Sequence, residues 1–213
     1  HRSYPVSGHA DFESALATYL SETGGIAECT TIAIAAAGPI IDHSVQLTNA
    51  PWRINQQDVS HCYRLPVLLV NDLEAVALAL PFLRPENLRQ IGGVSLERAE
   101  RTAMLALNVG TGFGAATILP VRDGWITCAS EAGHMTLGAE NERELRIIAS
   151  GNDAMPTVET ALSGAGLVSI HNRLLGSADT SGQGLRTAQE VIARQPDDPS
   201  PAMALETFTV LLG

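Results

Sequence analysis

Residues 66–80 read PVLLVNDLEAVALAL: an unbroken apolar run, a polar pair, and then a helical pattern. A short continuous apolar run such as Pro66 to Val70 is typical of a strand buried on both faces of a parallel sheet. The run leads directly into Asn71-Asp72 and then into a helix predicted from Leu73 to Leu83. Strands that alternate with helices at such spacings indicate an α/β protein.

The same alternation precedes this stretch. Apolar residues on one face predict a helix from Asp11 to Ser21, and a run of β-branched and small residues predicts a strand from Cys29 to Ala35. The segment from Ile40 to Leu47 is predicted to be the hairpin partner of that strand. Asn55 can cap a short helix from Gln56 to Cys62.

After the helix predicted to end at Leu83, a more polar segment from Pro85 to Arg101 is predicted to mark a change of domain. Strands are then predicted at 102–108, 115–119 and 125–129, with a hairpin turn at Asp123-Gly124. Helical patterns follow at 140–149, 158–175 with a break near Ser163-Gly164, 185–193 and 201–212, and Pro196 to Pro201 is predicted to be a linker.

Composition excludes several functions. The 213 residues carry a net charge of −10, and all 13 basic residues are arginine. Without lysine there is no Walker A loop and no Schiff-base chemistry. The acidic balance argues against nucleic acid or an anionic membrane as partner, since both require clustered positive charge. No apolar run reaches the roughly 18 residues of a membrane span.

The cysteines indicate neither disulfides nor a metal. Cys29, Cys62 and Cys128 are an odd number at wide spacings, and the chain has no CxxC pair. A disulfide framework and a zinc site are therefore not indicated, and no metal site is predicted. We expect buried, reduced thiols, as is typical of a cytoplasmic protein.

Asp72 stands where a predicted strand meets a predicted helix. Ligands of open α/β sheets bind at the carboxyl ends of strands, and a carboxylate there can accept a proton from a substrate hydroxyl. Aspartate is also a common helix cap. From the residues alone, both interpretations stay open.

The stretch LNVGTGFGA, residues 107–115, has three interpretations. Gly110, Thr111 and Gly112 could cradle phosphate with backbone N–H groups and a hydroxyl, or form a glycine hairpin without a ligand. A dinucleotide-binding fingerprint also matches, with Glu131 as the ribose-binding acid. That fingerprint needs a helix after the glycines, whereas residues 115–119 (AATIL) are strand-like.

Three further side chains are candidates for binding a polyol. Glu131 and His134 lie three residues apart on a glycine-containing loop, SEAGH, and Glu159 precedes the glycine-containing sequence LSGAGL. Acids and imidazoles on loops offer hydrogen bonds to hydroxyl groups. Each also has a structural interpretation: a histidine satisfied within the protein, or an acid in the first turn of a helix.

Taken together in order, these motifs resemble those of the bacterial glucokinase family, which belongs to the superfamily of hexokinase, actin and Hsp70 nucleotide-binding domains. The related ROK kinases mostly carry a cysteine-rich zinc motif, which this chain lacks. The matching segments are TNAPW (48–52), LLVNDLEAVALALP (68–81), IGG (91–93), NVGTGFGAA (108–116), SEAGHM (130–135) and ETALSGAGLV (159–168).

The resemblance implies ATP-dependent phosphorylation of a hexose, glucose at its 6-hydroxyl, in the cytoplasm as part of glycolysis. Asp72 would accept the hydroxyl proton, and magnesium would bridge the phosphates. It also implies binding roles for two groups of residues. Asn71, Glu131, His134 and Glu159 would hold the sugar hydroxyls, and Gly110, Thr111 and Gly112 would hold phosphate.

The implied fold is α/β, a two-domain ribonuclease H-like (actin-like ATPase) fold with mixed sheets flanked by helices. Residues 1–100 would be the remainder of a small N-terminal α/β domain, and 101–213 the first part of a large one. The family's first phosphate segment and its adenosine segment are missing, so we expect a piece that is incomplete at both ends and has little kinase activity alone.

Two further expectations accompany this resemblance. A homodimer is compatible with it, and a non-catalytic sugar-sensing or regulatory domain on the same fold is the alternative function. A sensor would have no need of Asp72 as a base. The loop around Glu131 departs from the family because Ala129-Ser130 precedes the acid and Ala132 follows it, where the family usually has glycines.

Overall fold

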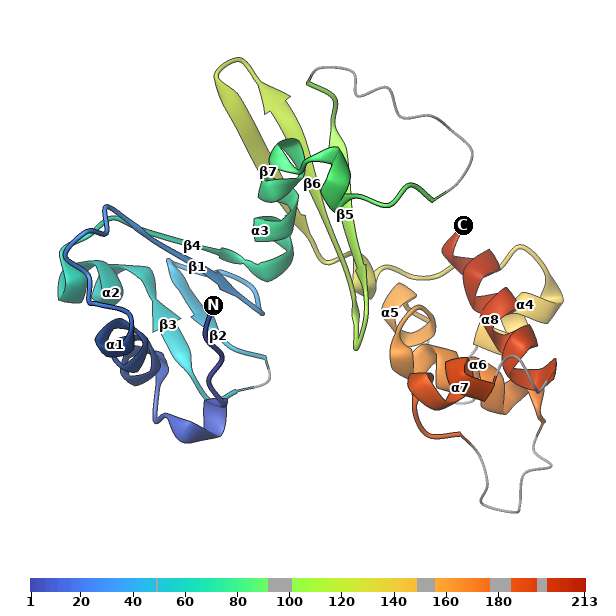
Figure 1. The fold of residues 1–213 in the computed structure, drawn as a ribbon. Helices are drawn as coiled ribbons and strands as arrows, with labels where there is room; N and C mark the ends of the chain where they lie inside the picture. The colour runs from blue at the N-terminus through green and yellow to red at the C-terminus, as the bar shows by residue number, and fades with distance from the viewer. Residues whose placement is uncertain (49, 92–100, 149–155, 177–184, 195–198) are drawn as a thin grey trace. The chain divides into compact units, whose positions relative to one another are not determined.

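The computed structural model describes residues 1–48, 50–91, 101–148, 156–176, 185–194 and 199–213. Its strands and helices follow one another in the order of an α/β protein (Figure 1). Asn49, the pair Gly92-Gly93 and residues 196–198 of the linker predicted at 196–201 lie outside the described residues. Residues 199–201 of that linker are helical instead. The chain divides into two compact units. One comprises His1–Met104 and Thr117–Ala129, and the other comprises Leu105–Ala116 and Ser130–Gly213.

Two parallel strands form the centre of the first unit. β1 (Ile32–Ala36) pairs with β4 (Val67–Asn71), in a register that runs from Ile32 opposite Val67 to Ala36 opposite Asn71. The predicted parallel pairing of the apolar run is therefore confirmed. Burial on both faces is not, because Leu68 is 49% exposed.

Helices complete the core of this unit. α1 (Phe12–Glu22) packs Phe12 and Leu16 against buried residues of the strands, and α2 (Gln56–Tyr63) adds Val59. α3 (Asp72–Ala79) follows β4 directly. The helix predicted to reach Leu83 ends earlier because Pro81 has no N–H, and the chain continues as a 3-10 turn, η2 (Leu80–Phe82). Two other 3-10 turns are η1 (Val6–Gly8) and η3 (Pro85–Asn87).

The predicted hairpin between 29–35 and 40–47 is wrong. β2 (Ser44–Gln46) instead pairs antiparallel with β3 (Arg53–Asn55), a strand that the sequence did not indicate. Asp42 and His43 both have positive φ, 48° and 60°, and a bridge joins Ile41 to Ser44. This primed turn folds the segment back on itself, so only its second half forms a strand.

A three-stranded sheet follows in the order β5-β6-β7. β5 (Met104–Val109), β6 (Phe113–Val121) and β7 (Gly124–Ser130) confirm the three predicted strands. Connections this short require antiparallel neighbours. Because the residues after Gly112 form a strand, the dinucleotide-binding interpretation is wrong: it required a helix there.

Helices predominate in the described residues that follow β7. α6 (Gly164–Leu174) lies against α8 (Pro199–Leu212), and their apolar faces share a core with Ile147, Leu185 and Val191. The predicted break falls at the start of α6, where the Ser163 hydroxyl accepts the Gly166 N–H. The other helices of this part are η4 (Ala132–His134), α4 (Glu142–Ile148), α5 (Val158–Ala161) and α7 (Ala188–Arg194).

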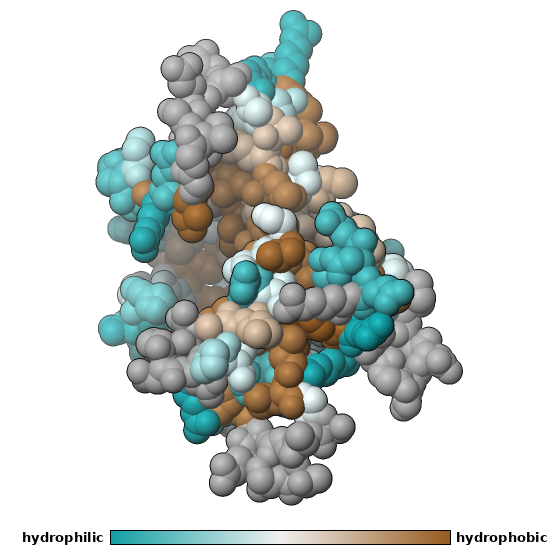
Figure 2. Space-filling view, turned by 90° about the vertical axis from the view of Figure 1, so that its right-hand side faces the viewer, coloured by the Kyte–Doolittle hydropathy of each residue, from teal (hydrophilic) through white to brown (hydrophobic). Residues whose placement is uncertain are grey.

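Apolar surface is mixed with polar surface on the face shown in Figure 2. Several large apolar side chains of the helices are exposed, among them Ile192, Met203 and Val210. The expectation that the three cysteines are buried is wrong, because all three are exposed. None of the helices in the described ranges is long and apolar enough to cross a membrane.

Candidate active site

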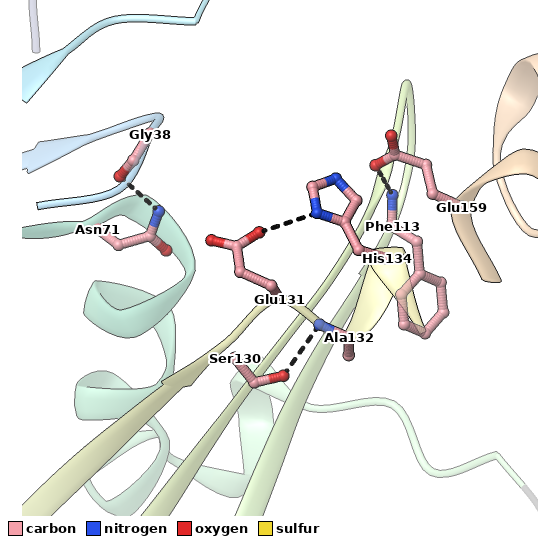
Figure 3. A network of polar contacts seen from close by, with 8 residues as sticks. All are labelled: Gly38, Asn71, Phe113, Ser130, Glu131, Ala132, His134 and Glu159. Carbon is pink, nitrogen blue, oxygen red and sulfur yellow. Dashed lines mark hydrogen bonds and ion pairs between the residues drawn. The ribbon is translucent and has the colours of Figure 1, made fainter. Parts of the chain in front are cut away.

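Asn71 ends β4 and caps α3 (Figure 3). Its Oδ1 accepts the backbone N–H groups of Leu73 at 3.0 Å and Glu74 at 3.4 Å. Its Nδ2 donates to the carbonyl of Gly38 at 3.2 Å. One side chain therefore joins the turn after β1 to the end of β4 and the start of α3.

Asp72 is the first residue of α3 and is exposed. Its Oδ1 accepts the N–H of Leu73 at 2.9 Å. The cap of this helix is Asn71, so the interpretation of Asp72 as the helix cap is wrong.

Glu131 and His134 lie at the two ends of a short turn in the second unit (Figure 3). Glu131 Oε2 is 4.0 Å from His134 Nδ1, and the side chains are 75% and 71% exposed. Ser130 Oγ accepts the N–H of Ala132 at 3.1 Å, which fixes the start of the turn. An exposed pair at this distance contributes little to stability, so both side chains are free to bind a ligand.

The glycine turn joins β5 to β6. The Gly110 N–H donates to the Gly112 carbonyl at 2.9 Å, and the Gly110 carbonyl accepts the Gly164 N–H at 2.8 Å. Thr111 is exposed at the tip. Glu159, on α5, is half-buried, and its Oε2 accepts the N–H of Phe113 at 3.0 Å.

The predicted residues fall into two groups. Asn71 and Asp72 belong to the first unit. The second unit holds the others and brings Glu159 against the glycine turn by the bond to Phe113. It also holds the turn from Glu131 to His134, which packs against α5.

Sequence reasoning missed two contributors. Gly38 accepts the Asn71 bond, and its φ of 138° is a conformation that only glycine adopts readily. Gly133 is buried, and a Cβ there would lie 2.5 Å from the Phe113 carbonyl. The Gly38-Pro39 pair was a visible turn signal, but its partner 33 residues away was not. No group of three or more His, Cys, Asp or Glu in the described segments could hold a metal ion.

A model of one protein family, Glucokinase, matches residues 1–213. The chain belongs to the glucokinase family. It is 33% identical over 214 residues to the glucokinase of Paramagnetospirillum magneticum, and the aligned region covers 96% of this chain and 65% of that protein. It is 35% identical to the glucokinase of Chromobacterium violaceum, covering 94% of this chain and 58% of that protein. The chain thus spans less than two thirds of these relatives.

Solved structures of glucokinases share its fold. A glucokinase from an Antarctic psychrotroph superposes with a TM-score of 0.79 at 23% identity, over 99% of this chain and 66% of that one. Glucokinase from Balamuthia mandrillaris in complex with glucose gives 0.72 at 20%, over 97% and 63%. A ROK hexokinase from Thermus thermophilus gives 0.58 at 20%, over 91% and 59%. The predicted fold class, an actin-like ATPase fold, is confirmed.

Proposed function

We propose that the protein carrying this chain transfers the γ-phosphoryl group of ATP to the 6-hydroxyl of glucose. The match to the glucokinase family over the whole chain carries this proposal. The exposed carboxylate of Asp72, at the carboxyl end of β4 and relieved of capping by Asn71, supplies the chemistry. No observation favours the sugar-sensing alternative.

In this proposal Asp72 is the general base. As the sugar oxygen bonds to the γ-phosphorus, its proton passes to the Asp72 carboxylate, and the bond from phosphorus to the β–γ bridging oxygen breaks to release ADP. Asn71 acts beside it by fixing the first turn of α3, because its side chain bonds to Leu73, Glu74 and Gly38. That turn sets the position of Asp72.

Glu131 and His134 are proposed to hold other sugar hydroxyls, together with Asn71 and Glu159. The exposure of Glu131 and His134 leaves their polar atoms available. Several such bonds select one epimer, because a misplaced hydroxyl leaves polar groups of the protein without partners.

Gly110, Thr111 and Gly112 are proposed to hold the phosphates of ATP. A Cβ at Gly110 would meet nothing closer than 3.8 Å, which leaves space beside the turn. Because the Gly110 N–H already donates to the Gly112 carbonyl, the N–H groups of Thr111 and Gly112 are the proposed donors. Backbone amides and a hydroxyl suit phosphate oxygens. Mg²⁺ bound to ATP would neutralise charge on the phosphates. We further propose a cytoplasmic location, a role in glycolysis and a homodimer.

The decisive variant is Asp72→Asn in the complete gene product that carries this chain. We expect kcat to fall by roughly 10²- to 10⁴-fold, the usual contribution of a general base, while glucose affinity stays within a few-fold. A coupled assay of ADP release measures kcat, and calorimetry measures glucose binding.

Asp123→Asn is the matched control. Asp123 is an exposed residue of the turn between β6 and β7, and Asn-Gly suits such a turn as well as Asp-Gly. Its kinetics should equal those of the wild type. Loss of glucose binding together with turnover in Asp72→Asn would make Asp72 a sugar ligand instead. Absence of glucose phosphorylation by the wild type would overturn the proposed function.

A further inference from the structure

The first turn of α5 forms hydrogen bonds to residues next to both predicted binding loops of the second unit. The Val158 N–H donates to the Met135 carbonyl at 2.9 Å, directly after the turn that carries Glu131 and His134. Glu159 Oε2 accepts the Phe113 N–H at 3.0 Å, directly after the glycine turn (Figure 3). One short helix thus fixes the backbone of two loops that are distant in sequence.

Two glycines leave room for the Glu159 side chain. A Cβ at Gly112 would overlap Glu159 Oε2 and lie 3.2 Å from its Cδ. A Cβ at Gly133 would lie 3.3 Å from Glu159 Cβ and 3.4 Å from Oε2. The carboxylate of Glu159 therefore packs between the glycine turn on one side and the loop of Glu131 and His134 on the other.

We infer that Glu159 is a positioning residue: it sets the conformation of the phosphate turn through Phe113 and links it to the sugar loop through Gly133. This deepens the proposed function and rests on it. The resemblance implies only a sugar ligand at this position. In the structure one carboxylate oxygen is already engaged by a backbone N–H of the glycine turn.

The link has a definite consequence. A hydrogen bond to a charged acceptor is stronger than a neutral one, so the carboxylate restrains the turn at Phe113. Without it, Gly110 to Gly112 can adopt many conformations, because glycine is permissive. Loss of Glu159 then weakens the use of ATP, which a sugar ligand alone would leave unchanged.

Amide hydrogen exchange tests the contact without any assay of activity. In the complete gene product, Glu159→Ala should raise the exchange rate of the Phe113 amide roughly tenfold or more, the effect of losing one hydrogen bond to a charged group. Glu159→Gln keeps a neutral carbonyl acceptor and should exchange at a rate between those of the wild type and Glu159→Ala. Glu142→Ala, which removes only an exposed pair with Arg146, is the control. Unchanged exchange in Glu159→Ala overturns the inference.

A double-mutant cycle tests the packing. Gly112→Ala should lower the Tm of the wild type, because the new methyl group meets the Glu159 carboxylate. In the Glu159→Ala background the same substitution should lower the Tm much less. Equal decreases in both backgrounds would show that the carboxylate does not occupy this space and would overturn the inference.

Steady-state kinetics then separate the two roles. Glu159→Ala should raise the KM for ATP by roughly tenfold or more, and Glu159→Gln should restore it in part, because its neutral carbonyl is a weaker acceptor. A change confined to the KM for glucose overturns the positioning role. If the wild type phosphorylates no glucose, the proposed function fails. The exchange and Tm results still decide whether Glu159 holds the glycine turn.

Discussion

At the scale of single residues, the turn after β1 depends on Gly38. Its φ of 138° is strained for any residue with a side chain, and a Cβ there would lie 2.9 Å from the Gln46 carbonyl and 3.1 Å from Val45 Cγ2. Its carbonyl also accepts the bond from Asn71. The position of the helix that begins at Asp72 therefore depends on a residue 34 positions earlier.

We predict that Gly38→Ala lowers the free energy of unfolding by about 1–3 kcal/mol, the cost of one residue held in an unfavourable backbone conformation. Urea denaturation measures it. Gly138→Ala is the matched control, because a Cβ there meets nothing within 4 Å and no positive φ is required. It should change stability by less than about 0.5 kcal/mol. Equal effects of the two substitutions would contradict the argument.

Residue identity alone did not separate the roles of Asn71 and Asp72. Both are good helix caps by type, and the sequence left open whether Asp72 is the cap or a general base. The structure assigns the cap to Asn71 because that residue keeps extended backbone angles, φ −61° and ψ 149°, while Asp72 already belongs to the helix. This leaves the Asp72 carboxylate exposed for the proposed chemistry.

At the scale of elements, α1 begins with a capping box. Asp11 Oδ1 accepts the Ser14 N–H at 2.8 Å, and Ser14 Oγ accepts the Asp11 N–H at 3.3 Å. The backbone hydrogen bond from Ser14 is the main cause that lowers the pKa of Asp11. Because the folded state favours the charged form, the cap contributes its full stability above the unfolded pKa of about 3.9.

We predict that Asp11→Ala lowers the Tm at neutral pH and that this difference shrinks as the pH falls through the lowered pKa of Asp11. Below it the wild-type carboxyl is protonated and no longer a charged acceptor. Thermal melts of both proteins across the acid range measure the difference. The Asp11→Asn variant keeps a capping oxygen that does not titrate. The contribution of the cap to its Tm should therefore stay constant across the acid range. A constant difference between wild type and Asp11→Ala would contradict the prediction.

The elements themselves were largely predictable. Helices and strands with a strong apolar period, such as α1, β4 and β6, follow from local pattern because one face must be buried. β3 was missed because its three residues, Arg53–Asn55, carry too little pattern and are ordered by pairing with β2. The predicted end of α3 is too late because the apolar period continues past Pro81, where the helix has already ended.

At the scale of the molecule, one side-chain bond joins distant segments of the first unit. The Thr127 hydroxyl on β7 donates to Glu74 on α3, and both groups are partly buried. The bond helps to explain why Thr117–Ala129 belongs with the N-terminal residues. The sequence predicted two consecutive domains that divide at residue 100. This domain division stays a prediction.

We predict that Thr127→Val lowers the free energy of unfolding by about 1 kcal/mol, because it leaves a partly buried carboxylate oxygen without its donor. Glu74→Gln keeps an acceptor at the same place and should cost less. Denaturant titration of the single and double variants gives the coupling energy. Additive effects would show that the two side chains do not interact.

The sequence by itself determined the α/β class, most strands and helices, the kinase-like set of motifs and the exclusion of lysine chemistry, since all of these depend on residue type and local period. Only the tertiary structure decided that β2 pairs with β3, that Asn71 rather than Asp72 is the cap, and that Glu159 holds the glycine turn. The pairing of β2 with β3 and the contact of Glu159 depend on groups that meet across 11 and 46 residues of chain. The cap depends on the backbone angles of Asn71, whose side chain is also held by Gly38, 33 residues away. Such meetings are fixed by packing and by the need to pair polar groups, which no local pattern records.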